Sequence, residues 1–152
     1  MIYLLDVNVL VGLGYETHSL HIRSKSWIAD AYGMAGGVQF ATCSVTEMGF
    51  VRVATGKDTQ LSPDVPSARR DLARLKKHWS IVLLNDSLGA DYLPIWAHKP
   101  EHVTDGHLLA LAKYHNAELA TLDRGIRGAI LLPELLAGSN RVQEPYSQYG
   151  SN

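Results

Sequence analysis

Four acidic residues stand where predicted strands end or predicted helices begin. Asp6 and Asp123 each close a short apolar run, and Glu47 and Asp105 each fall in the first turn of a predicted helix. A carboxylate at the end of a buried strand is costly unless a cation neutralises its charge. Clustered carboxylates bind hard cations such as Mg²⁺ or Mn²⁺ through oxygen, and such cations assist the hydrolysis of phosphodiester bonds. The four acids therefore predict one acidic, metal-binding pocket.

Two of these acids also have a simple role in helix capping. Asp6 can cap the helix that follows the first strand, and so can Asn8. Glu47 fits a capping box in which Ser44 is the N-cap and Glu47 reaches back to its backbone N–H. Taken alone, capping is the better interpretation of Glu47, and for Asp6 the two interpretations are equal.

The other two acids have comparable alternatives. Thr104 can cap the helix that carries Asp105, and an acid in a first turn suits the helix dipole. Asp123 can serve as a turn residue before Gly125. These explanations weaken when the four acids are considered together, because an open parallel sheet offers one crevice that all of them can face.

Apolar runs and helical periodicities alternate along most of the chain. Strands are predicted at 2–5, 38–42, 81–84, 118–122 and 129–132, and helices at 9–13, 18–34, 44–54, 67–79, 91–97 and 104–115. This alternation predicts an α/β domain with a mainly parallel central sheet of about five strands and helices on both faces. Such sheets bind ligands beyond the carboxyl ends of their strands, where Asp6 and Asp123 lie.

Composition and charge exclude several classes of protein. The 152 residues are 46% hydrophobic and 19% charged, which predicts one globular domain at 1–137 followed by a polar tail at 138–152. The net charge of −1 argues against a grip on long duplex DNA. The single cysteine, Cys43, excludes an internal disulfide and is expected in the core. With neither a secretion signal nor a membrane span in the sequence, a cytoplasmic protein is expected.

Two groups of basic or titratable residues are interpreted as structural. The basic stretch at 69–77 is amphipathic on a helix, and a solvated face is favoured over a ridge that binds RNA. None of the seven histidines forms an H-E-x-x-H pattern. His107 lies closest in sequence to Asp105, but surface or core-edge positions are favoured over catalytic ones.

Four segments resemble, in order, the motifs of one nuclease family. They are Leu-Asp-Val-Asn-Val-Leu at 5–10, Thr-Glu-Met-Gly-Phe-Val-Arg-Val at 46–53, Val-Thr-Asp-Gly-His-Leu-Leu-Ala-Leu-Ala at 103–112 and Leu-Ala-Thr-Leu-Asp-Arg at 119–124. Together they resemble PIN-domain ribonucleases, and most closely the VapC-type toxins of bacterial toxin–antitoxin pairs. The resemblance covers nearly the whole chain. Gly106 is a departure, because the nearest relatives often carry alanine there.

The resemblance implies an endoribonuclease that depends on Mg²⁺ or Mn²⁺, acts on RNA, usually forms a homodimer and is silenced by a small antitoxin protein. Carried over by position, Asp6 and Asp105 are the chief metal ligands, and Glu47 and Asp123 complete the acidic site. Asn8 and Thr121 would hold the carboxylates in place by hydrogen bonds. Repulsion among the acids is expected to raise some of their pKa values.

The homodimer is also expected from the N-terminal apolar residues, which look too numerous for one sheet face: Leu10, Val11, Leu13, Tyr15, Trp27 and Tyr32.

Two rival functions keep the same fold: a housekeeping RNA-processing nuclease and a non-catalytic binding module. A phosphotransfer domain is a third rival. A dehalogenase-type phosphatase would want aspartate where this chain has Asn8, and a receiver domain would want a lysine after a late strand.

Overall fold

The central sheet has five parallel strands in the order β3-β2-β1-β4-β5. The computed structural model describes residues 1–136, so the predicted tail at 138–152 lies outside the described residues. The strands are β1 (Ile2–Leu5), β2 (Gln39–Thr42), β3 (Val82–Leu83), β4 (Glu118–Thr121) and β5 (Ile130–Leu131). The predicted fold class is confirmed, although both edge strands are shorter than predicted.

Five α-helices and two short 3₁₀ helices connect the strands. They are α1 (Val7–Gly14), α2 (His21–Tyr32), α3 (Ser44–Ala54), α4 (Val65–His78), η1 (Ala90–Tyr92), η2 (Pro100–His102) and α5 (Val103–Tyr114). The helix predicted at 91–97 is wrong, because only a 3₁₀ turn forms there before Pro94, which lacks a backbone N–H. The helix predicted from residue 18 begins three residues later, at His21.

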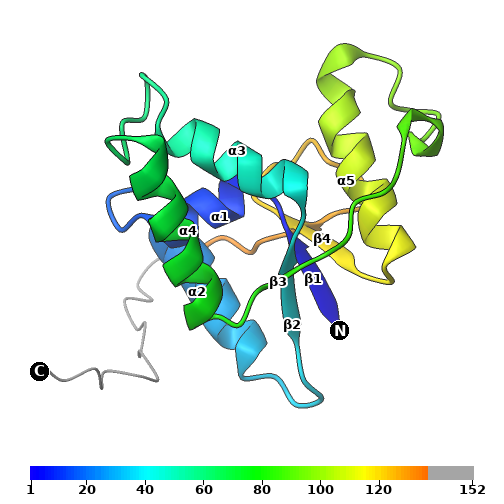
Figure 1. Ribbon diagram of the computed structural model, residues 1–152. Coiled ribbons are helices and arrows are strands. Elements are labelled where there is room, and N and C mark those ends of the chain that lie inside the picture. The colour runs from blue at the N-terminus through cyan, green and yellow to red at the C-terminus, as the bar shows by residue number, and fades with distance from the viewer. Residues whose placement is uncertain (137–152) are drawn as a thin grey trace, which may run out of the picture.

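The strands bury alternate residues on the two faces of the sheet. Leu4 and Leu119 pack with Leu108 and Leu111 of α5 on one face. The next residue on β1, Leu5, packs on the other face with side chains of α1 to α4. Figure 1 shows the result, with α1 to α4 on one side of the sheet and α5 on the other. The prediction of helices on both faces is confirmed.

Most of the apolar residues near the N-terminus are buried in this core. Leu10, Val11 and Leu13 are buried within the protomer, and Trp27 packs partly buried against them. Tyr32 is exposed, and its ring contacts Trp79 of the same chain. The expectation that these residues form a spare apolar surface for a dimer is therefore wrong, because α2, α3 and α4 cover α1.

Two glycines allow the close contacts that position the acidic residues. A Cβ atom at Gly49 would lie 2.5 Å from Val7 Cγ2, so the missing side chain lets α3 pack directly on α1. A Cβ atom at Gly106 would lie 2.9 Å from Ala97 Cβ and 3.1 Å from Pro94 Cδ. Gly106 thus brings the segment at 94–97 against the first turn of α5.

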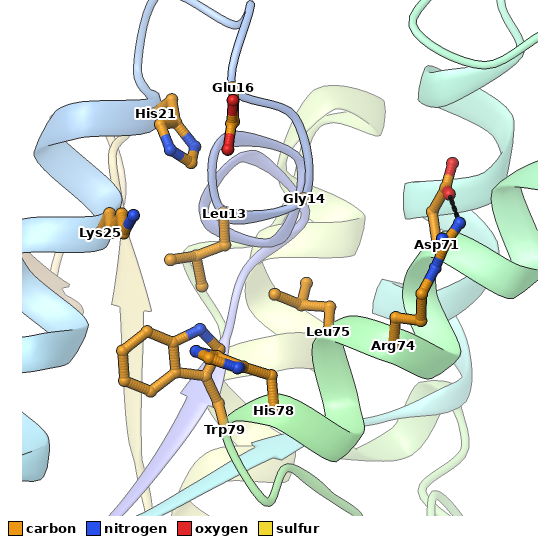
Figure 2. A pocket seen from close by; sticks show the side chains of 10 residues that line it. All are labelled: Leu13, Gly14, Glu16, His21, Lys25, Asp71, Arg74, Leu75, His78 and Trp79. Carbon is orange, nitrogen blue, oxygen red and sulfur yellow. Dashed lines mark hydrogen bonds and ion pairs between the residues drawn. The ribbon is translucent and has the colours of Figure 1, made fainter. Parts of the chain in front are cut away.

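Several basic side chains of α4 form ion pairs or hydrogen bonds within the helix or with the neighbouring helix α3. Arg74 pairs with Asp71 at 2.7 Å, and Arg70 donates to the Ser67 hydroxyl. Figure 2 shows the open pocket between α1, α2 and α4, of about 550 Å³, which the Asp71–Arg74 pair lines on one side and Trp79 on the other. These contacts support the interpretation of the basic stretch as a solvated helical face.

Candidate active site

The four acidic residues lie at the ends of elements along the carboxyl edge of the sheet. Asp6 directly follows β1, and Asp123 follows β4 by two residues. Because β1 and β4 are hydrogen-bonded neighbours, these two acids lie on adjacent strand ends. Glu47 and Asp105 both stand in first turns, of α3 and α5 respectively.

The hydroxyl of Thr121 links the first and last acidic segments. Thr121 is fully buried and donates a hydrogen bond of 2.6 Å to Asp6 Oδ2. Its oxygen accepts from the Asn8 side-chain amide at 3.3 Å and from the Asp123 backbone N–H at 3.0 Å. Asn8 also accepts from the Leu122 backbone N–H at 3.2 Å. The predicted positions of Asn8 and Thr121 as hydrogen-bonding supports agree with these contacts.

Asp6 also acts as the N-cap of α1. Its Oδ1 accepts the backbone N–H of Val7 at 2.7 Å, and the residue is only 8% exposed. Asp6 therefore both caps α1 and belongs to the group of acidic residues. Asn8 does not cap the helix, because it lies inside the first turn and uses its amide to reach β4.

Burial and mutual repulsion raise two of the acidic pKa values. Burial raises the pKa of Asp6, and the nearby negative charge of Asp123 adds to this effect. Burial also raises the pKa of Asp105, followed by repulsion from Asp6 and Asp123. The three aspartates are thus close enough to sense one another, and the expected effect is confirmed for Asp6 and Asp105.

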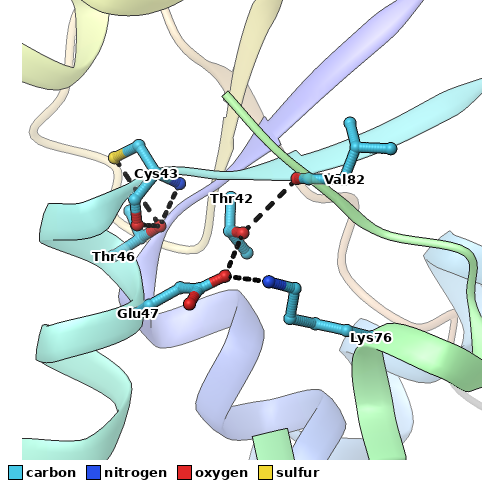
Figure 3. Close-up of polar contacts among 6 residues, drawn as sticks. All are labelled: Thr42, Cys43, Thr46, Glu47, Lys76 and Val82. Atoms are coloured by element: carbon cyan, nitrogen blue, oxygen red, sulfur yellow. Dashed lines mark hydrogen bonds and ion pairs between the residues drawn. The ribbon is translucent and has the colours of Figure 1, made fainter. Parts of the chain in front are cut away.

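Glu47 is held from two other directions. The Thr42 hydroxyl donates to its Oε1 at 2.6 Å, and the ammonium of Lys76 on α4 pairs with the same oxygen (Figure 3). The expected capping box is misplaced: Cys43, not Ser44, is the N-cap, and Thr46 completes the box. Glu47 is therefore not used for capping, because Ser44 is the first residue of the helix and Cys43 is its N-cap.

Replacing Lys76 by methionine tests whether this ion pair holds α4 to α3. Met keeps the apolar stem and removes the charge, so Glu47 is left half-buried with Thr42 alone. We expect the free energy of unfolding to fall by about 1 kcal/mol, a drop in Tm of about 2–4 °C. Lys77→Met on the exposed neighbouring position is the matched control and should change Tm by less than about 1 °C. Equal effects of the two substitutions would contradict a structural role for the pair.

Asp105 projects from the first turn of a helix that begins without a side-chain cap. The turn η2 leads directly into α5, and His102 is the N-cap residue. Thr104 lies inside the helix, so its expected role as the cap is wrong. Asp123 accepts the backbone N–H of Gly125 at 2.7 Å, as its expected role in a turn requires, while remaining exposed.

The donor set suits a hard divalent cation, although the side chains are not gathered into a finished site. Within residues 1–136, no group of three or more His, Cys, Asp or Glu side chains is close enough to hold an ion. Asp6, Asp105 and Asp123 interact electrostatically, whereas Glu47 bonds to Thr42 and Lys76. Their oxygens are the ligands that Mg²⁺ and Mn²⁺ prefer.

Two further polar groups border this edge of the sheet. Lys76 pairs with Glu47, and Asp86, just after β3, pairs with His107 at 2.7 Å. Asp86 follows a strand as Asp6 does, so the same rule would have found it in the sequence. Lys76 is 29 residues from its partner, and no spacing signals that contact. His107 is thus a half-buried partner of Asp86, consistent with a core-edge position.

Comparisons with known proteins identify the family of this chain. The family model described as "PIN domain" matches residues 3–129. Ribonuclease VapC38 of Mycobacterium tuberculosis is 39% identical over 126 residues, which cover 81% of this chain and 86% of that protein. Ribonuclease VapC29 of the same species is 34% identical over 140 residues, covering 88% and 98%. This chain therefore belongs to the PIN-domain family and, within it, to the VapC ribonucleases.

A solved structure supports the fold independently. The crystal structure of VapBC2 from Rickettsia felis bound to a promoter DNA fragment contains a chain that matches with a TM-score of 0.53. The match covers 86% of this chain and 97% of that chain at 16% identity. At this identity the likeness shows the fold alone.

Over the described residues, no helix is both long and apolar enough to cross a membrane.

Proposed function

We propose that this protein is the toxin of a toxin–antitoxin pair, an endoribonuclease that depends on Mg²⁺ or Mn²⁺ and hydrolyses RNA phosphodiester bonds. The observation that carries the proposal is the electrostatic contact of Asp6, Asp105 and Asp123 at the carboxyl edge of the sheet. Membership of the VapC ribonucleases supports the same activity.

In the proposed site, Asp6 and Asp105 bind the cation and Glu47 and Asp123 complete the ring of acids. When bound, the cation supplies a water of lowered pKa and positive charge that offsets the charge developing on the phosphate. Thr121 and Asn8 fix the Asp6 carboxylate, whose two oxygens already accept one hydrogen bond each. Lys76 offsets the charge of Glu47 and keeps its carboxylate on the α4 side of the site.

RNA cleavage that stops on chelation is the direct test. Purified protein free of antitoxin should cut RNA in the presence of Mg²⁺ or Mn²⁺, and EDTA should reduce the rate by at least about 10²-fold. Total bacterial RNA mapped by the ends it acquires is a suitable substrate, because it offers many sequences at once. Undiminished cleavage in EDTA would contradict the metal-dependent mechanism.

Two partners complete the proposal. An antitoxin protein is proposed because the relatives are VapC ribonucleases, and a neighbouring small gene that relieves growth arrest on co-expression would identify it. A homodimer is proposed on the resemblance alone, because the apolar residues of α1 counted in its favour are buried in the protomer. Light scattering measures this directly.

The two rivals differ from this proposal in measurable ways. A housekeeping nuclease would cleave RNA without arresting growth when expressed. A non-catalytic binding module would cleave nothing, and it would not need Asp6 and Asp105 to share a site in which burial and repulsion penalise their charges.

A further inference from the structure

Lys76 brings a positive charge of the chain itself to one of the four acidic residues. Its ammonium pairs with Glu47 Oε1, and the same oxygen accepts the Thr42 hydroxyl at 2.6 Å. Figure 3 shows Lys76 entering from α4 and Thr42 from the end of β2, with the second oxygen of Glu47 outside both contacts. Glu47 therefore has a counter-charge within the chain.

The three aspartates have a different electrostatic environment. Burial raises the pKa of Asp105, and the negative charges of Asp6 and Asp123 raise it further. The positive charge of His102 opposes this shift but is the smallest contribution. Burial also raises the pKa of Asp6, and the charge of Asp123 adds to that effect. The charge that a divalent cation would balance is therefore concentrated on the aspartates, whereas Glu47 lies against an ammonium.

Packing holds Lys76 in this position as well as charge. The side chain of Lys76 is 24% exposed and that of Glu47 is 17% exposed. Both line a groove between α3 and α4 that Val51 and Leu72 also line, so the stem of Lys76 lies along apolar surface. The Lys76 carbonyl accepts the backbone N–H of Ile81 at 2.9 Å, which ties the end of α4 to the segment before β3. The ammonium is thus held at Glu47 by a packed helix.

An ammonium and a divalent cation compete for the same carboxylate oxygen. In nucleases that use two metal ions, the ions lie about 3.5–4 Å apart and clamp the attacking and leaving oxygens. A second ion on the Glu47 side would meet the Lys76 ammonium, and positive charges this close repel strongly in a half-buried site. Displacing Lys76 would leave its half-buried ammonium without a partner, which is costly. The ammonium and a second ion therefore exclude each other at Glu47.

We propose that the Lys76 ammonium takes the place of a second divalent cation, so that the acidic site binds a single ion, at the aspartates. This inference rests on the proposed metal-dependent function and deepens it, because it assigns the number of ions. Lysine suits the role because its ammonium is a compact point charge with three donors. A residue of α4, outside the four acids, thus determines how many ions bind.

Manganese binding in the absence of RNA tests the number of ions. Electron paramagnetic resonance distinguishes free from bound Mn²⁺ as the ion is titrated into the full-length protein, and wild type should bind about one Mn²⁺ per chain. Lys76→Met keeps the apolar stem and removes the charge, so Glu47 becomes free to hold a second ion and the variant should bind about two. Lys77→Met, at the exposed neighbouring position, is the matched control and should match wild type.

Further variants locate the second ion. Lys76→Arg keeps the positive charge and should bind as many ions as wild type. The double variant Lys76→Met/Glu47→Gln should also return to the wild-type number, because the second ion depends on the Glu47 carboxylate. Asp105→Asn should raise the Kd of the first ion at least about tenfold, whereas Glu47→Gln alone should change it less than about threefold. Thermal melts show that each variant is folded, and Lys76→Gln stands in if Lys76→Met is not.

The outcomes separate this inference from the proposed function. A second ion in wild type, or no second ion in Lys76→Met and Lys76→Gln, would overturn the inference and leave the ion pair as a structural contact. Cleavage of RNA that EDTA stops would still support the proposed function in that case. If the ion numbers are as expected but no RNA is cut, the ribonuclease proposal fails and the role of Lys76 stands. If neither wild type nor the variants bind Mn²⁺, the inference is wrong whatever the cleavage assay gives.

Discussion

Asp105→Asn should abolish RNA cleavage, with kcat/KM lower by at least about 10³-fold, and should make the metal-free protein slightly more stable. The carboxylate is a proposed metal ligand, and the amide removes its charge at nearly constant shape. In the folded protein, burial and repulsion from Asp6 and Asp123 penalise that charge. We expect Tm to rise by about 1–2 °C at neutral pH.

The pH dependence of stability checks the cause. The pKa of Asp105 is raised above its ordinary value of 3.8, so the folded protein binds more protons than the unfolded chain between 3.8 and the raised pKa. Its contribution to the free energy of unfolding is therefore present below 3.8 and is lost as pH rises through this window. The asparagine of Asp105→Asn never becomes charged, so this variant does not lose that stability as pH rises. Its Tm should therefore exceed that of wild type at neutral pH and equal it below pH 3.8. A gain that persisted at low pH would point to another cause.

Asp6→Asn should abolish cleavage equally but without the gain in stability. Burial raises the pKa of Asp6 too, yet its Oδ2 accepts the only proton of the Thr121 hydroxyl. An amide nitrogen in that place would face a hydroxyl that already accepts from Asn8 and from the Asp123 backbone. A melt of both variants together distinguishes them. If Asp6→Asn gained as much as Asp105→Asn, the Thr121 network would have no stabilising effect.

Thr121→Val should destabilise the fold more than the loss of the Lys76 ion pair does. Valine has the same shape and suits a strand, so the loss reports the hydroxyl alone. It would leave the Asp6 carboxylate, the Asn8 amide and the Asp123 backbone N–H each without one partner. At about 1 kcal/mol for each group, we expect a loss of about 3 kcal/mol, or about 6–12 °C in Tm.

Thr121→Ser is the control, because it keeps the hydroxyl and removes only a methyl group. It should cost about 1 kcal/mol and retain cleavage, whereas Thr121→Val should also lose activity because Asp6 is no longer oriented. Denaturant melts and cleavage of one RNA measure both effects. Similar losses for valine and serine would assign the effect to packing rather than to hydrogen bonding.

The sheet and the acids at its edge could be predicted from the sequence. Parallel strands with buried faces read as apolar runs, and an acid directly after such a run, as at Asp6, is conspicuous. Asn8 and Thr121 are indicated only by the family resemblance, because nothing in their spacing shows that they meet across 113 residues. Long-range contacts of this kind depend on which strands become neighbours.

Predictions of local structure from the sequence were wrong where two signals favoured different structures at the same position. Ser44 and Glu47 match a capping box, but Ser44 is the first residue of the helix and not its N-cap, so Cys43 and Thr46 form the box. The segment at 91–97 has a helical composition, although Pro94 prevents a regular helix there. The expected apolar surface for a dimer was wrong for a different reason. The apolar residues of α1 are covered by α2, α3 and α4 of the same chain.

The bare backbone at Gly106 has a consequence for the segment that precedes α5. Alanine would favour a helix more, but its methyl group would press on Ala97 and Pro94. Those two residues bracket Trp96 in sequence, so one added methyl group would move this segment while leaving every acid in place. A single position thus links the shape of the segment before α5 to the first turn that carries Asp105, independently of the acids themselves.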